Sequence, residues 1–194
     1  CDFLQRDVRE SFADLGVESG DYLTTTNYAP PPKRSKGVMV KDVAELVMHA
    51  RLWVWKMNMK TGETAEHVLN PDLNAEFPSY NGRLTGRKTR FGYLVDHSET
   101  VTLQWSGIRK FDLDTGADLG AWSDDPQHSW YSEPWFAEAD TPQAEDHGYV
   151  VVFQWNAALH RRTLDIFDAR DISRGPVAQV ALIERLPAGF HACW

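Results

Sequence analysis

Two stretches of the chain carry one pattern: Lys56-Met57-Asn58-Met59-Lys60-Thr61-Gly62 and Lys110-Phe111-Asp112-Leu113-Asp114-Thr115-Gly116. Each ends a strand-like segment in a tight turn, where glycine supplies the positive φ that such turns often require. Asn58 and Asp112 are 54 positions apart, and a looser third copy, Asp165-Ile166-Phe167-Asp168-Ala169, follows 56 positions later. The sequence therefore predicts a repeated unit of about 55 residues.

The segments around these turns are short and rich in aromatic and β-branched residues, and Gly, Pro, Asp or Asn bounds each one. They are residues 52–59, 91–95, 101–105, 149–155, 163–167 and 177–183. Many short strands separated by turns predict an all-β sandwich, barrel or propeller. The repeat favours the propeller, because its blades are four-stranded sheets with sequence repeats of about 40–50 residues in the common types. We expect about three blades in residues 51–194, and a polar connecting segment in residues 1–50.

Charge and hydropathy exclude several classes of protein. Lys and Arg number 20 against 28 Asp and Glu, which gives a net charge of −8, and the basic residues are scattered. A nucleic-acid partner is therefore not expected, since it requires a concentrated basic face. No stretch approaches the roughly 18 apolar residues of a membrane-spanning helix.

A second set of motifs, located downstream of the turns, also repeats at a regular spacing. The three motifs are Ala75-Glu76-Phe77-Pro78, Ser132-Glu133-Pro134-Trp135-Phe136 and Ala188-Gly189-Phe190-His191. Glu76, Glu133 and His191 are separated by 57 and 58 positions, so they occupy equivalent places in successive units. Because the innermost strands of propeller blades line one axis, we expect these three side chains to converge. Buried together they require pairing or a metal ion, whereas separately they would be blade-rim and turn residues.

Six motifs follow one another in order between about Arg51 and Trp194. They are Glu76-Phe77-Pro78; Gly86-Arg87 with Arg90-Phe91-Gly92-Tyr93; Ser132-Glu133-Pro134-Trp135-Phe136; Glu145-Asp146-His147-Gly148-Tyr149; Asp168-Ala169 with Gly175-Pro176-Val177-Ala178; and Leu186-Pro187 with Gly189-Phe190-His191. This series resembles the motifs of the carotenoid cleavage oxygenases, a family that includes lignostilbene-cleaving enzymes.

The resemblance implies a seven-bladed propeller that holds a non-haem Fe(II) ion on its axis through four histidines, supported by three glutamates. His191 is the last of those four ligands by this resemblance, and Glu76 and Glu133 are supporting glutamates. Imidazole suits Fe(II), and an incomplete coordination sphere leaves room for O2. A carboxylate that accepts the other ring N–H of a ligating histidine fixes its tautomer and orientation.

The implied activity is that of a dioxygenase. With O2, it cleaves a C=C bond of a carotenoid, apocarotenoid or stilbene to give two carbonyl products. Phe77, Trp135 and Phe190 lie beside the inferred axial residues and are the candidates for contact with such an apolar conjugated substrate. Family members often touch membranes, so peripheral membrane contact is also implied, although the sequence shows no basic amphipathic patch.

The remaining histidines match no ligand motif of the family and are expected to be surface or structural residues: His49, His67, His97, His128, His147 and His160. The family's first three iron ligands lie upstream of every matched segment. The chain also begins at Cys1 without Met and ends at Trp194. We therefore expect a C-terminal fragment of a longer enzyme, without its N-terminal targeting region. The sequence leaves its compartment, cytoplasm or plastid, and its oligomeric state open.

Two other functions remain open at this point. A metal-independent propeller hydrolase would use Glu76 and Glu133 as a paired acid and base, with their carboxyl groups about 5–10 Å apart. It leaves His191 without a role. A non-catalytic propeller that serves as a binding module would tolerate the loss of Glu76 with an effect on stability alone.

Overall fold

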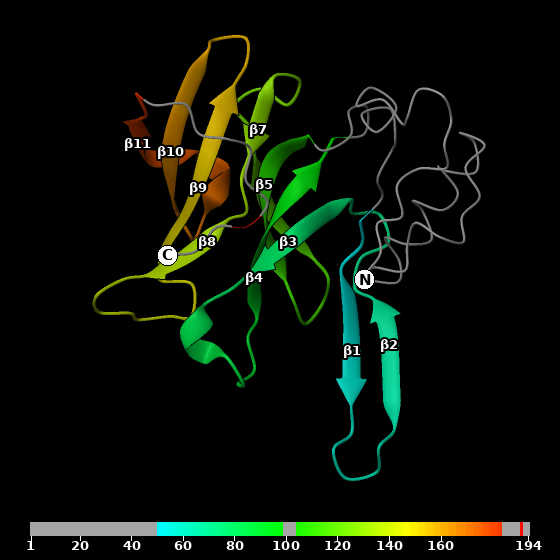
Figure 1. Ribbon diagram of the computed structural model, residues 1–194. Helices are drawn as coiled ribbons and strands as arrows, with labels where there is room; N and C mark the ends of the chain where they lie inside the picture. The colour runs from blue at the N-terminus through cyan, green and yellow to red at the C-terminus, as the bar shows by residue number, and fades with distance from the viewer. Residues whose placement is uncertain (1–49, 99–103, 184–190, 192–194) are drawn as a thin grey trace, which may run out of the picture.

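The computed structural model describes residues 50–98, 104–183 and 191 (Figure 1). Within them the chain forms eleven β-strands and two short 3-10 helices, and these residues contain no α-helix, so the predicted all-β class is confirmed. The strands are β1 (Trp53–Met57), β2 (Thr64–Val68), β3 (Ala75–Ser79), β4 (Phe91–His97), β5 (Trp105–Asp112), β6 (Asp118–Trp122), β7 (Ser129–Tyr131), β8 (Trp135–Glu138), β9 (Gly148–Asn156), β10 (Arg161–Asp168) and β11 (Pro176–Ala181); the helices are η1 (Gly82–Leu84) and η2 (Ile172–Arg174).

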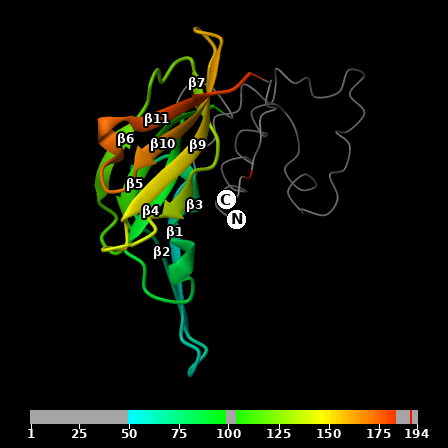
Figure 2. The same cartoon turned by 90° about the vertical axis from the view of Figure 1, so that its left-hand side faces the viewer.

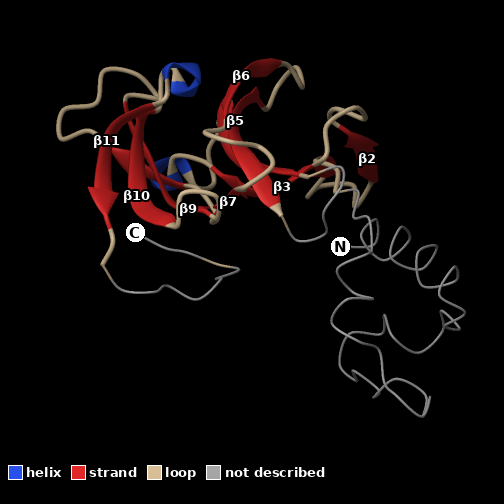
Figure 3. Cartoon of the chain, turned by 90° about the horizontal axis from the view of Figure 1, so that it is seen from above, coloured by secondary structure: helices blue, strands red, loops and turns tan. Residues whose placement is uncertain are grey.

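The strands form three antiparallel sheets that lie side by side (Figure 3). The first is the β1–β2 hairpin. The second, called the β3–β6 sheet, has the order β3-β4-β5-β6. The third, the β7–β11 sheet, has the order β11-β10-β9-β7, with β8 also paired to β9. Antiparallel sheets of mostly consecutive strands are typical of propeller blades. The first unit has only two strands, so the number of blades in this chain and the seven blades of a complete ring stay predictions.

Two predictions about segments fall largely outside this description. The expected connecting segment 1–50 lies outside the described residues except for Ala50, and residues 101–103 of the expected strand 101–105 are also outside them. None of the helices in the described ranges is long and apolar enough to cross a membrane.

The two turns that suggested the repeat have the same hydrogen bonds. Asn58 Oδ1 accepts the backbone N–H groups of Lys60 and Thr61, and Asp112 Oδ1 accepts those of Asp114 and Thr115. In both turns the glycine N–H then donates to the carbonyl of the Asn or Asp residue, and the glycine has φ of 76°. These side chains favour turns because they offer the backbone a local acceptor. Asp168, in the third copy, accepts from the backbone of Arg170 in the same way.

The two glycines nevertheless differ in their surroundings. A Cβ atom at Gly62 meets nothing within 4 Å, whereas one at Gly116 would clash with the carbonyl oxygen of Leu69, near the base of the β1–β2 hairpin. Asn70 Nδ2 donates to the carbonyl of Gly116 at 3.0 Å across the same junction. The turn at Gly116 therefore joins the hairpin to the β3–β6 sheet.

Gly116→Ala is expected to destabilise the chain more than Gly62→Ala does. Both substitutions place a side chain at positive φ, which costs about 1–2 kcal/mol, but only Gly116→Ala also forces two backbone segments apart. Urea unfolding of the two variants measures the difference. Equal losses would show that the contact between the hairpin and the sheet contributes nothing.

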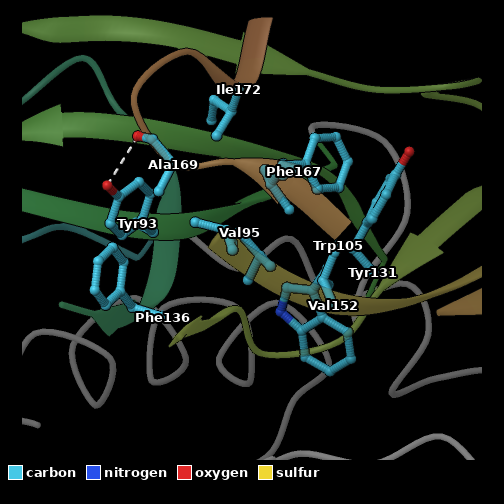
Figure 4. Close-up of a cluster of buried hydrophobic side chains, with 11 residues drawn as sticks. Tyr93, Val95, Trp105, Tyr131, Phe136, Val152, Phe167, Ala169 and Ile172 are labelled. Carbon is cyan, nitrogen blue, oxygen red and sulfur yellow. Dashed lines mark hydrogen bonds between the residues drawn. The ribbon is translucent and has the colours of Figure 1, made fainter. Parts of the chain in front are cut away.

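In Figure 2 the β7–β11 sheet lies in front of the β3–β6 sheet. The hydrophobic core lies between the sheets (Figure 4). Its larger cluster joins the β3–β6 and β7–β11 sheets through Tyr93, Val95, Trp105, Ile108, Tyr131, Phe136, Val150, Val152, Phe167, Ala169 and Ile172. A smaller cluster on the other face of β4 contains Ala75, Leu94 and Phe111, with Leu52 and Leu69 from the hairpin. Strand β4 is buried on both faces, so the β3–β6 sheet is enclosed between its two neighbours.

The Glu145-Asp146-His147-Gly148-Tyr149 motif connects the same two sheets. Glu145 Oε1 accepts the backbone N–H groups of Arg90 and Phe91 at 2.7 and 2.8 Å, at the start of β4. Asp146 Oδ2 lies 2.6 Å from Nζ of Lys110, whose side chain is only 4% exposed. The loop thus supplies the countercharge for a buried lysine.

Strand β11 overlaps the expected strand 177–183, and most of its residues are exposed. Val177 and Val180 are exposed because β11 is the edge strand of its sheet. On the face turned away from the core, Val180 pairs with Leu164, which pairs with Phe153. This apolar row is partly exposed, as expected of a blade face that another blade covers in a closed propeller.

Candidate metal centre

Each of the two predicted glutamates lies at an irregularity at the edge of its sheet, Glu76 within β3 and Glu133 between β7 and β8. Glu76 pairs with Val95 and Ser79 pairs with Tyr93, so β3 contains one more residue than the opposing stretch of β4. Along β9, the pairing passes from Tyr131 to Trp135 with one extra residue as well, and Glu133 lies in that gap between β7 and β8. A bulge of this kind redirects a side chain out of the sheet.

A proline accompanies both bulges, and backbone strain accompanies the one at Glu76. Pro78 follows Glu76 by two positions, and Pro134 follows Glu133 directly. Phe77, between Glu76 and Pro78, has φ of 53°, an uncommon value for an aromatic residue. Strained backbone of this kind persists where the surrounding structure holds it, and it often occurs at functional sites.

The bulges bring Glu133 and Phe77 to His191, although these residues come from three different units of the chain. His191 Nδ1 lies 3.1 Å from Glu133 Oε2. The ring of Phe77 packs edge-on against the imidazole of His191, with 5.5 Å between ring centroids. His191, Glu133 and Phe77, one residue from each of the three motifs, therefore lie together.

Glu76 completes the group from the side of β3. Its Oε1 accepts the indole N–H of Trp105 at 2.6 Å and lies 3.0 Å from Nε2 of His97. Burial by itself raises the pKa of Glu76, but the contacts with His97 and Trp105 and the charge of His191 outweigh it, so the pKa lies below its usual value. Glu76 is therefore a carboxylate at neutral pH.

The chemistry of these residues is suited to one part of a metal site. Since Glu133 engages Nδ1 of His191, the Nε2 atom is the one left to bind a metal, which is the arrangement typical of metal-bound histidines. Within residues 50–98, 104–183 and 191, no cluster of three or more His, Cys, Asp or Glu could by itself hold a metal ion. The described residues thus offer one imidazole that could bind a metal with carboxylate support, and a complete site would need further ligands from elsewhere.

The candidates for substrate contact are placed differently. Phe77 contacts both His191 and Trp105, and so lies within the centre. Trp135 is half-buried in β8 and, among the described residues, makes no ring contact with His191. Phe190 lies outside the described residues.

Sequence reasoning missed two residues of this centre, His97 and Trp105. His97 was expected to be a surface or structural histidine, and its side chain is buried with 1% exposure beside Glu76. Trp105 gave no signal beyond its place in an apolar strand. Glu76 pairs with Val95, two positions before His97 in β4, and His97 pairs with Trp105 in β5, a proximity that no sequence motif signals.

The fold and the centre together define a β-propeller protein with a histidine–glutamate site where its inner strands meet. Residues 13–194 match the family described as retinal pigment epithelial membrane protein, and the chain belongs to this family. This confirms the resemblance to carotenoid cleavage oxygenases, because the similar proteins include such enzymes. The carotenoid 9,10(9',10')-cleavage dioxygenase 1 of Arabidopsis thaliana is 31% identical over 154 residues, which are 73% of this chain and 28% of the relative.

Other relatives extend the range of chemistry. The apocarotenoid-15,15'-oxygenase of Synechocystis is 29% identical over 144 residues, and the isoeugenol monooxygenase of Pseudomonas nitroreducens is 28% identical over 155. These matches cover 73% and 74% of this chain, but 29% and 32% of the relatives. The chain therefore spans about a third or less of the length of the relatives it matches.

Solved structures agree with the propeller fold. The cobalt-substituted Synechocystis apocarotenoid oxygenase superimposes with a TM-score of 0.73 at 26% identity, over 86% of this chain and 34% of that one. Its Glu150Asp variant gives a TM-score of 0.68 at 27% identity, over 77% and 31%. A metal-substituted enzyme among these structures indicates that the family contains metalloenzymes.

Proposed function

We propose that this chain supplies the C-terminal part of a non-haem Fe(II)-dependent dioxygenase that cleaves a C=C bond of a conjugated apolar substrate. The observation that supports it is the pairing of His191 Nδ1 with Glu133 Oε2, which directs Nε2 of the imidazole to a metal. Fe(II), when bound, would supply the activation of O2 for the oxidative cleavage of the C=C bond into two carbonyl groups.

The residues of this chain have distinct roles in that reaction. His191 binds the metal through Nε2, and Glu133 holds its ring orientation. Glu76 carries a second negative charge near the centre, which favours the bound cation. Phe77 forms an apolar wall beside His191 and excludes water from one side of the site.

The whole enzyme requires more than this chain. One neutral nitrogen ligand binds Fe(II) weakly against water, so the other ligands come from segments that the relatives possess and this chain does not cover. The activity accordingly belongs to the full-length protein and not to residues 1–194 alone. O2 and a carotenoid, apocarotenoid or stilbene are its proposed substrates.

The relatives favour an oxygenase over the two alternatives. All three of those described above are oxygenases by name, and none is a hydrolase or a binding module. A hydrolase that uses Glu76 and Glu133 also has no role for His191, which contacts Glu133 directly.

The proposal is tested with the full-length protein that contains this chain, purified without oxygen and loaded with Fe(II). Iron content is measured first. Cleavage is then followed by chromatography with an intact carotenoid, an apocarotenal, a hydroxystilbene and isoeugenol. We expect about one iron per chain and carbonyl products from at least one substrate. Cleavage that persists after complete removal of metal would contradict the proposal.

A further inference from the structure

Glu76 is held by two aromatic side chains that come from neighbouring strands. His97 is the last residue of β4 and Trp105 the first of β5, and the two are paired across an irregularity in the register. Their rings lie 6.1 Å apart, and both side chains are buried in or beside the core between the sheets. The end of the β4–β5 pair therefore forms a fixed wall against the carboxylate.

Both contacts reach the same oxygen of Glu76. Trp105 Nε1 donates to Oε1 at 2.6 Å, a short distance typical of a hydrogen bond to a charged acceptor, and His97 Nε2 lies 3.0 Å from the same atom. Among the described residues, none donates to the other oxygen, Oε2. Trp105 and His97 thus fix Oε1, while Oε2 can accept a hydrogen bond from another group.

Trp105 also connects this carboxylate to the imidazole. Its ring packs against Phe77 with 5.4 Å between centroids, and Phe77 packs against His191 at 5.5 Å. Phe77 has a strained backbone that requires support from its surroundings. Trp105 gives that support while it holds Glu76. A single side chain therefore positions both Glu76 and Phe77, the residue that packs against His191.

We propose that Trp105 and His97 are positioning residues of the metal centre. They hold Oε1 of Glu76 so that Oε2 is presented to an N–H group of the centre, and Trp105 also keeps Phe77 against His191. This inference rests on the proposed function, because the centre is assigned to Fe(II) there. Neither residue touches the metal or the substrate in this scheme.

The chain offers a closely matched pair of tryptophans for the test. Trp105→Phe in the full-length protein removes the indole N–H but keeps an aromatic ring in the core. Trp122→Phe is the control, since Trp122 packs against the same cluster and, in the part of the chain that is described, its Nε1 donates to no acceptor. We expect Trp105→Phe to weaken Fe(II) affinity by about 10–100-fold, the usual effect of losing an outer partner, and Trp122→Phe to leave it unchanged.

His97 provides a second comparison. His97→Leu removes the polar contact with Glu76, whereas His97→Gln places an amide N–H group at a position similar to that of Nε2. We expect His97→Leu to lower Fe(II) affinity and to alter the electron paramagnetic resonance spectrum of the iron–nitric oxide complex. His97→Gln should restore both toward wild type.

If Trp105→Phe and Trp122→Phe lost Fe(II) affinity equally, Trp105 would act only through packing, and the inference would be overturned. No loss in Trp105→Phe would do the same. If the wild-type protein binds no iron at all, the proposed function fails instead. The positioning role is then decided by the crystal structure of metal-free Trp105→Phe, in which an unmoved Glu76 carboxylate contradicts it.

Discussion

His191→Ala in the full-length protein is expected to reduce bound iron strongly and to lower the rate of cleavage by more than about 100-fold, beyond the effect of losing an outer partner. The substitution removes the imidazole that we propose as a metal ligand, and with it the contact with Glu133. Glu133→Gln keeps an acceptor for the Nδ1 proton but removes the charge. It is expected to lower Fe(II) affinity by about 10–100-fold.

The matched control is His67→Ala, which removes an exposed histidine from the β1–β2 hairpin. Its iron content and rate should equal those of the wild-type protein. Iron is measured by colorimetric assay after gel filtration, and the folded state of each variant is checked by circular dichroism. Full iron content in a folded His191→Ala protein would show that His191 is not a ligand.

Asp146→Ala is expected to produce the largest loss of stability among the substitutions considered for the sheets. Lys110 is buried between the β3–β6 and β7–β11 sheets, and Asp146 is its countercharge at 2.6 Å. Removal of one partner of a buried ion pair leaves an uncompensated charge, which costs about 3–5 kcal/mol. The carbonyl of Arg170 and the ring of Phe91 also contact the Nζ group of Lys110, but neither replaces a full charge.

Denaturant unfolding of the full chain measures this effect against two controls. Asp114→Ala breaks an ion pair with Lys88 that is largely exposed, so little change is expected. The double substitution Lys110→Met with Asp146→Ala removes both charges and should recover most of the stability. If Asp146→Ala were as mild as Asp114→Ala, the buried pair would have no special role.

The fold was predicted mainly from the turn residues and the repeat. Asn58 and Asp112 act locally, since each side chain accepts hydrogen bonds from residues two and three positions later. Local interactions of this type are visible in sequence, and they led to the correct fold class. The exposed β11 was not predicted, because composition reports how apolar a strand is and not whether another sheet covers it.

The candidate site was predicted only in part, because only some of its residues belong to the repeated motifs. Glu76, Glu133 and His191 could be aligned because the repeat places them in one register. His97 and Trp105 belong to no repeated motif, and their contacts with Glu76 depend on the pairing of three strands in space. Pairings of this kind follow from tertiary structure, which residue spacing alone does not specify.

The bulges at Glu76 and Glu133 have a consequence for solubility as well as for the site. One lies in the edge strand β3 and the other between the edge strands β7 and β8. Unpaired N–H and C=O groups at such edges would otherwise recruit a strand from another molecule. The extra residue twists the edge, and Pro78 and Pro134 remove an N–H donor from it. The same local distortion that aims a carboxylate at His191 therefore also protects an open sheet edge against aggregation.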